Sequence, residues 1–395
     1  MIIIANAIDF SDPALKKLPL TFHQPFKGIY AFARISSLIV LIPAWGIYYS
    51  ITRPRESWTV KECVSNRMIR WFMPLNSYCG LHPLSLDKTK EPSPESLKET
   101  SFIWIEPVED SLIRGIALDD KVKSVRVPGY VWPKTQALED AEDLVGLWIH
   151  GGGYMMGNAS ESFGESEIPR QLSKRSRVKN ILSLDYRLVH EGCHPAQLLD
   201  ALSAYTHLVK TLGISSSKIV FMGACAGGNL VPMLVRYLYE EKVLPLPAGM
   251  MLFSPVLDMV IDLEMKQNLS GPRPNTSIDM LATSHIPNVR LMGHNDLKLL
   301  ASPYLSSNRA FPGSYKSYPP TFISIGDAEA LKREAEQLHH LMKNDGVNVI
   351  LDEQPDASHD FLGVPIIPND KARENAIVRA CEWIEWIGHG EGTGI

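Results

Sequence analysis

Short apolar segments alternate with longer amphipathic segments over most of the chain. The apolar segments have the length of β-strands, and we expect eight of them, at residues 101–107, 122–132, 145–149, 181–184, 218–222, 249–254, 321–325 and 348–352. Helical spacing predicts helices at residues 196–212, 229–242, 330–345 and 370–388. This alternation predicts an α/β domain with a mostly parallel sheet covered by helices on both faces. The first two strands follow each other without a helix, so we expect an antiparallel pair at the start of the sheet.

Two breaks in this pattern predict the domain organisation. Residues 84–100 are polar and rich in proline and serine, which is typical of a linker. We therefore expect an N-terminal cap region and linker at residues 1–100 and a catalytic domain at residues 101–388. Residues 258–318 interrupt the alternation with few periodic runs, and a segment of that length usually forms a lid or part of a binding wall. We interpret it as a cap insertion.

The N-terminal region contains an uncharged apolar segment at residues 35–52, flanked by Arg34 and Arg53. Its length is at the lower limit for a helix that spans a membrane, and Pro43 interrupts it. Two interpretations stay open: a cap helix that folds over a binding pocket, and a segment that contacts a membrane. The first residues lack the pattern of a cleaved signal peptide. We therefore expect an intracellular protein, either cytoplasmic or associated with the membrane of the endoplasmic reticulum.

Composition and charge exclude several classes of protein. With 45% hydrophobic and 21% charged residues, the 395-residue chain has the composition of an ordinary globular protein. Its net charge of −5 disfavours binding to a nucleic-acid backbone. The five cysteines lie far apart and show neither zinc-type spacing nor a disulfide framework. We expect no metal, and no organic cofactor, because the glycine-rich segment does not match a dinucleotide-binding pattern.

A small-residue turn follows the predicted strand at 218–222. The sequence Gly223-Ala-Cys225-Ala-Gly227 leads directly into a helical pattern, which is the arrangement of a nucleophile elbow. In such a turn the central residue adopts a strained conformation, and the glycines allow the backbone to pass closely. The motif predicts that Cys225 projects above the sheet. A buried structural cysteine in a glycine turn is the alternative.

Three further segments place polar groups at the ends of predicted strands. The first, His150-Gly-Gly-Gly, exposes backbone N–H groups that can converge on an oxyanion. His359 follows the last predicted strand and is placed as a base, and Glu329 follows the strand before it. Asp327 and Glu329 could equally stabilise the start of a helix. In chain order the segments provide oxyanion glycines, nucleophile, acid and base, the order of an α/β-hydrolase triad.

These motifs make the chain resemble the α/β-hydrolase fold, and within it the hormone-sensitive-lipase-like esterases, over roughly residues 100–388. The N-terminal Arg53-Pro54 and Ser57-Trp58 resemble fungal steryl acetyl hydrolases and hydrolases of secondary metabolism. The motifs that carry the resemblance are His150-Gly-Gly-Gly-Tyr, Asp185-Tyr186-Arg187-Leu188, Gly223-x-Cys-x-Gly-Gly-Asn-Leu and Gly326-x-x-Glu-x-Leu.

The resemblance implies a role for each candidate residue. It implies Cys225 as nucleophile, His359 as base and Glu329 as acid, with Asp327 the second choice. The oxyanion donors it implies are the amides of Gly151, Gly152 and Ala226. The family usually has Asp-Ser-Ala where this chain has Ala224-Cys225-Ala226, so the nucleophile becomes a thiol and the preceding carboxylate is lost.

Three functions are consistent with this set of residues. The first is a hydrolase of esters, lactones or thioesters with a Cys–His–Glu triad, acting on a small apolar acyl-bearing substrate that contacts Tyr154 and Met155. The second is an acyltransferase or cyclase, because a thioester also reacts with acceptors other than water. The third is a non-catalytic binding protein, which the presence of His359 disfavours. No oligomeric state is predicted.

Overall fold

The computed structural model describes residues 8–82, 85–282 and 284–388. Predictions that concern residues 1–7 and residue 84 lie outside the described residues.

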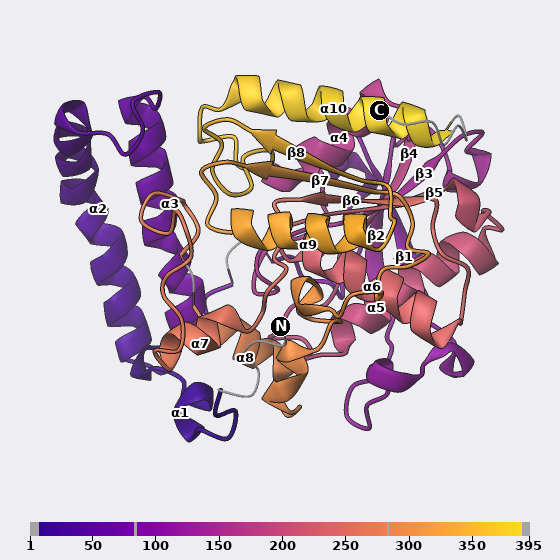
Figure 1. Ribbon diagram of the computed structural model, residues 1–395, viewed down its shortest axis with the longest axis horizontal. Helices are drawn as coiled ribbons and strands as arrows, with labels where there is room; N and C mark the ends of the chain where they lie inside the picture. The colour runs from indigo at the N-terminus through magenta and orange to yellow at the C-terminus, as the bar shows by residue number, and fades with distance from the viewer. Residues whose placement is uncertain (1–7, 83–84, 283, 389–395) are drawn as a thin grey trace.

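An eight-stranded sheet forms the centre of the molecule, in the order β1-β2-β4-β3-β5-β6-β7-β8 (Figure 1). β2 pairs antiparallel with both β1 and β4, and the remaining pairs are parallel. This confirms the predicted mostly parallel α/β sheet and its antiparallel start. The strands are β1 Ser101–Ile105, β2 Val127–Trp132, β3 Val145–Ile149, β4 Asn180–Leu184, β5 Ile219–Ala224, β6 Gly249–Phe253, β7 Thr321–Gly326 and β8 Val349–Gln354.

Strand β2 is shorter than predicted, because the prediction began at residue 122. Only residues 127–131 of β2 find partners in β1, which offers the five residues Ser101–Ile105. Residues 122–126 have no strand to pair with and remain irregular.

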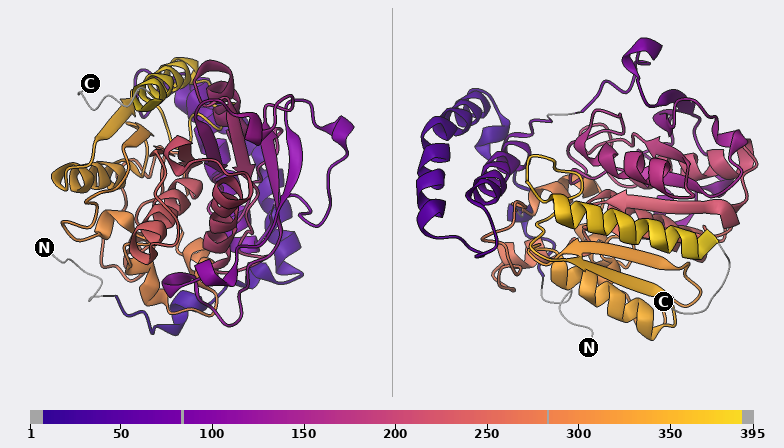
Figure 2. Two further views of the ribbon diagram at one scale, coloured as in Figure 1. Left: turned by 90° about the vertical axis from the view of Figure 1, so that its right-hand side faces the viewer. Right: turned by 90° about the horizontal axis from the view of Figure 1, so that it is seen from above.

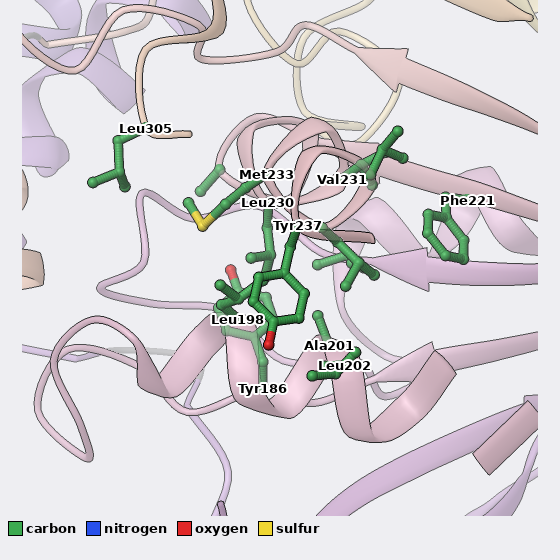
Figure 3. Packing of buried hydrophobic residues seen from close by; sticks show 14 of the residues in the cluster. Tyr186, Leu198, Ala201, Leu202, Phe221, Leu230, Val231, Met233, Tyr237 and Leu305 are labelled. Carbon is green, nitrogen blue, oxygen red and sulfur yellow. The ribbon is translucent and has the colours of Figure 1, made fainter. Parts of the chain in front are cut away.

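Helices cover both faces of the sheet, and neighbouring residues of one strand contribute to opposite cores. Leu147 belongs to the core cluster that includes side chains of α5 and α6, part of which Figure 3 shows, whereas Trp148 belongs to the cluster that includes side chains of α4 and α10. The strands are apolar throughout because both faces are buried. The helices of this domain are α4 Glu167–Arg175, α5 Ala196–Thr206, α6 Gly227–Glu241, α9 Lys332–Asn344 and α10 Asp370–Gly388. A π-helical turn at His207–Thr211 extends α5 over most of the predicted helix at 196–212.

Two N-terminal helices lie side by side at one end of the molecule. Helix α2, Phe26–Ile51, is the outer one, and α3, Val60–Cys79, lies between α2 and the α/β domain (Figures 1 and 2). Helix α2 starts earlier than the predicted segment at 35–52 and continues through Pro43. Helix α3 was not predicted, although a capping box formed by Thr59 and Glu62 starts it.

The segment between β6 and β7 contains α7 Ile261–Lys266 and α8 Ile286–Met292. It lies below α3 in Figure 1, near the short helix α1, Pro13–Lys16. The N-terminal helices and this insertion thus meet above one end of the sheet.

Candidate active site

Cys225 occupies a sharp turn between β5 and α6. Its φ of 48° lies in the left-handed region, which is strained for a residue with a side chain. The turn depends on its two glycines, because a Cβ on Gly223 would lie 2.5 Å from Gly227 and a Cβ on Gly227 would lie 2.0 Å from the Ile149 carbonyl oxygen. The structure therefore has the geometry expected of a nucleophile elbow, with the thiol at the start of α6.

His359 and Glu329 lie next to each other on the loops that follow β8 and β7. Nδ1 of His359 is 3.3 Å from Oε2 of Glu329, and both side chains are buried. The other oxygen of Glu329 accepts hydrogen bonds from the Ser254 hydroxyl at 2.5 Å and the Gly326 N–H at 2.7 Å. These two hydrogen bonds fix the position of the carboxylate. Because the carboxylate contacts Nδ1, the other ring nitrogen of His359, Nε2, remains available to the thiol.

Asp327, the second choice for the acid, points elsewhere. Its carboxylate accepts from the Arg55 guanidinium at 2.6 Å and from the Asp356 N–H at 2.7 Å. Arg55 also reaches the Asp356 carboxylate at 3.2 Å. Among these two acids, only Glu329 contacts the imidazole.

Asp279, a residue of the insertion that the sequence analysis missed, positions the loop of the histidine. One carboxylate oxygen accepts from the His359 N–H at 2.9 Å, and the other accepts from the Ala330 N–H at 2.7 Å. Asp279 is fully buried, and nothing in its local sequence distinguishes it from a surface acid.

The pKa values of His359 and Glu329 are both shifted by burial and by neighbouring groups. Burial lowers the pKa of His359, but the charge and hydrogen bond of Cys225, together with Glu329, raise it well above its ordinary value. Burial raises the pKa of Glu329, and the hydrogen bond to His359 opposes this increase. The surroundings of the imidazole therefore favour its protonated form.

The glycine loop after β3 corrects one prediction. The N–H of Gly151 donates to the buried carboxylate of Glu165, so this amide is not available as an oxyanion donor. Gly152 and Gly153 border the cavity together with Ala226. In the described part of the chain, no backbone carbonyl outside the regular elements accepts from the N–H groups of these three residues. The two glycine N–H groups that remain as candidate donors are therefore those of Gly152 and Gly153, one residue further along the chain than predicted.

Glu165 and Asp360 form a buried carboxyl pair beside the thiol, which no motif in the sequence predicts. The two side chains are hydrogen-bonded, and a hydrogen bond between two carboxyl groups requires one proton. Burial and the charges of Asp360 and Cys225 raise the pKa of Glu165 well above its ordinary value. Burial raises the pKa of Asp360 to about 6. Glu165 therefore holds the proton, and its other oxygen accepts from Gly151.

The stability of the protein should depend on this proton. In the unfolded chain both carboxyls ionise near their ordinary pKa values, whereas the folded pair keeps one proton at neutral pH. The folded state then binds more protons, so the free energy of unfolding falls as the pH rises. Above about pH 5 we expect the free energy of unfolding of the wild type to fall more steeply with pH than that of Glu165→Gln, whose amide does not titrate, by up to about 1.4 kcal/mol per pH unit. Urea unfolding at pH 5, 6 and 7 measures this, and equal slopes in both proteins would contradict the shared proton.

A cavity of about 360 Å³ opens above Cys225 and His359. Its roof comes from α3, which provides Ile69 and Met73, and from the insertion, which provides Met259 and Leu281. Tyr154 and Met155, the predicted substrate contacts, both line it. The hydroxyl of Tyr154 is already bound to Asn229 at 2.8 Å, so this side chain offers its ring to the cavity. The cavity is suited to an apolar substrate with a reacting group held at its floor.

The interpretation of residues 35–52 as the cap of this pocket is wrong. Helix α3 carries the lining side chains, whereas most of α2 is exposed. Trp45 packs edge-to-face on Trp71, with ring centroids 6.0 Å apart, and does not border the cavity.

Comparison with known proteins supports the α/β-hydrolase fold. Residues 146–363 match a family model described as alpha/beta hydrolase fold. An AB hydrolase superfamily protein of Schizosaccharomyces pombe is 26% identical over 210 residues, which cover 51% of this chain and 58% of that protein. An acetyl-hydrolase of Streptomyces hygroscopicus is 26% identical over 236 residues, covering 60% of this chain and 73% of that protein. The crystal structure of a hormone-sensitive lipase from a metagenome library superposes with a TM-score of 0.56 at 25% identity, covering 82% of this chain and 98% of that structure.

Proposed function

The chain belongs to the alpha/beta hydrolase family, and from this premise we propose that it is a carboxylic ester hydrolase with Cys225 as its nucleophile. The observation that carries the proposal is the presence of thiol and imidazole on the floor of one apolar cavity, with the buried Glu329 carboxylate next to the imidazole. Fold alone would not justify an activity, because members of one fold perform many reactions.

In the proposed reaction, the Cys225 thiolate attacks the carbonyl carbon of the ester. The amides of Gly152, Gly153 and Ala226 bind the oxyanion that forms. The tetrahedral intermediate collapses, the bond to the alcohol oxygen breaks, and His359 gives its proton to the departing alkoxide. A thioester on Cys225 remains.

Water completes the cycle. His359, now neutral, takes a proton from a water molecule while the oxygen attacks the thioester carbonyl. The second intermediate expels the thiolate and releases a carboxylic acid. Glu329 keeps the imidazole in the tautomer that presents Nε2 to the reacting atoms in both half-reactions.

The likeness to the acetyl-hydrolase supports an acyl ester as substrate, and the methionine and leucine side chains of the roof support an apolar alcohol or acyl group. Acyl transfer or ring closure is the second candidate. It is favoured by the burial of Cys225, whose exposed fraction is 6%, because a thioester shielded from water can react with another acceptor. The predicted place in fungal secondary metabolism stays a prediction.

Turnover of simple esters tests the proposal. We expect release of p-nitrophenol from p-nitrophenyl acetate and octanoate above the buffer rate, with free carboxylic acid as the product. Mass analysis of the products with added alcohol or amine separates the two candidates, since acyl transfer would yield a new ester or amide. Absence of both p-nitrophenol release and an acyl adduct on the protein would contradict both.

A further inference from the structure

The outward face of α2 carries a stripe of exposed apolar side chains. Phe32, Ile39 and Ile51 expose 74%, 79% and 82% of their surfaces. The residues of the stripe lie along one side of the helix, because spacings of three, four and seven residues return to the same face and Val40 adjoins Ile39; they are Ile29, Phe32, Ile39, Val40, Ile47 and Ile51. Exposed apolar surface of this extent marks an interaction site.

The opposite face of α2 already has a partner, namely α3. Nε of Arg34 donates to the carbonyl oxygen of Trp71 at 2.7 Å, and the guanidinium lies over the ring of that residue. Leu38 is the buried residue of the helix. The stripe therefore points away from the rest of the protein, as Figure 1 shows for the outer side of α2.

The charge around the stripe has one sign. Residues 13–55 contain six lysines and arginines and neither aspartate nor glutamate, although the whole chain has a net charge of −5. Lys16, Lys17 and Arg53 are exposed at the two ends of the segment. Cations beside an apolar helix face complement the anionic headgroups and acyl chains of a membrane.

Among the described residues, α2 is the helix long and apolar enough to cross a membrane by length and composition. Its packing argues against crossing. Helix α3 runs beside it and includes Lys61, Arg67 and Arg70, which a bilayer surrounding α2 would have to bury. A helix lying in the plane of the interface leaves these charges in water.

We propose that the outward face of α2 binds in the plane of an anionic membrane surface. The stripe enters the acyl region, and the lysines and arginines at its ends meet the headgroups. This surface is separate from the cavity, so the inference goes beyond the proposed function and does not depend on it.

Flotation with vesicles tests the proposal on the full chain. We expect the protein to float with vesicles of 70% phosphatidylcholine and 30% phosphatidylserine, and binding to fall at least tenfold with phosphatidylcholine alone or in 500 mM salt. Phe32→Asp combined with Ile39→Asp should weaken binding at least tenfold. The matched control combines Leu118→Asp with Phe311→Asp, which adds the same charge at exposed apolar residues elsewhere and should leave binding unchanged.

Three results would overturn the proposal. In the first, the wild type remains unbound to both kinds of vesicle. In the second, the two double variants bind equally. In the third, light scattering without vesicles shows a dimer that the α2 variant alone dissociates, which would assign the stripe to a second copy. Circular dichroism of both variants verifies that they are folded.

Discussion

Replacing Cys225 with alanine should lower kcat for ester hydrolysis at least a thousandfold while the protein remains folded. Removal of a nucleophile from a catalytic triad leaves only binding and oxyanion stabilisation, and losses of about 10³ to 10⁶ are usual. Alanine fits the turn at φ 48° no worse than cysteine, because both have one Cβ. Stopped-flow or steady-state release of p-nitrophenol measures the loss, and intact-mass analysis of the quenched wild type should find one acyl group on the peptide that contains Cys225.

Cys193 provides a matched control for this experiment. Its sulfur lies 3.5 Å from Nδ1 of His294, whose Nε2 is 2.8 Å from Asp119, so it also has an imidazole and a carboxylate beside it. It does not border the cavity over Cys225, which Gly152 and Gly153 line. Cys193→Ala should retain wild-type kcat. An acyl group on Cys193, or full activity in Cys225→Ala, would contradict the proposed nucleophile.

Glu329→Gln should reduce kcat by about 10³ to 10⁴, the loss seen when a triad carboxylate becomes an amide. The amide still accepts from Ser254 and Gly326 with its oxygen, but its NH₂ group then faces Nδ1 of His359. Nδ1 must accept this hydrogen bond, so the proton moves to Nε2 and the imidazole can no longer act as the base. The raised pKa of His359 should also fall, which moves the acidic limb of the kcat profile to lower pH.

Asp327→Asn is the control for the acid. Asp327 lies two residues before Glu329, on the same loop, but its carboxylate binds Arg55. We expect this variant to lose some stability from the weakened ion pair and to keep kcat within about fivefold of the wild type. A larger loss of kcat in Asp327→Asn than in Glu329→Gln would exchange the roles of the two acids.

The features that the sequence predicts correctly are those set by local pattern. The eight strands are visible because a sheet buried on both faces requires apolar runs such as 145–149. Cys225 is visible because its turn requires small residues on both sides. The strands that precede Glu329 and His359 are parallel, so their carboxyl ends lie at the same edge of the sheet. The two residues therefore meet at that edge.

The features that the sequence pattern does not predict depend on contacts between distant segments of the chain. A run of three glycines does not reveal which amide faces the cavity; Glu165, fourteen residues later, binds the first one. Asp279 and the Glu165–Asp360 pair are polar residues without a motif, and burial alone gives them their roles. Hydropathy finds α2 but not the direction of its apolar face, and the charged residues Lys61, Arg67 and Arg70 interrupt the apolar pattern of α3.

Arg55 links the helical hairpin of α2 and α3 to the two loops that carry the acid and the base, through Asp327 and Asp356. Trp58 adds a second link, since its indole N–H donates to the Asp356 carbonyl at 2.8 Å. A shortened chain that starts at residue 100, although it would retain every member of the proposed triad, would lose both braces as well as the α3 part of the roof. The hairpin is therefore an integral component of the enzyme's architecture, and removing it to improve solubility would sacrifice the geometry that the shortened protein was meant to preserve.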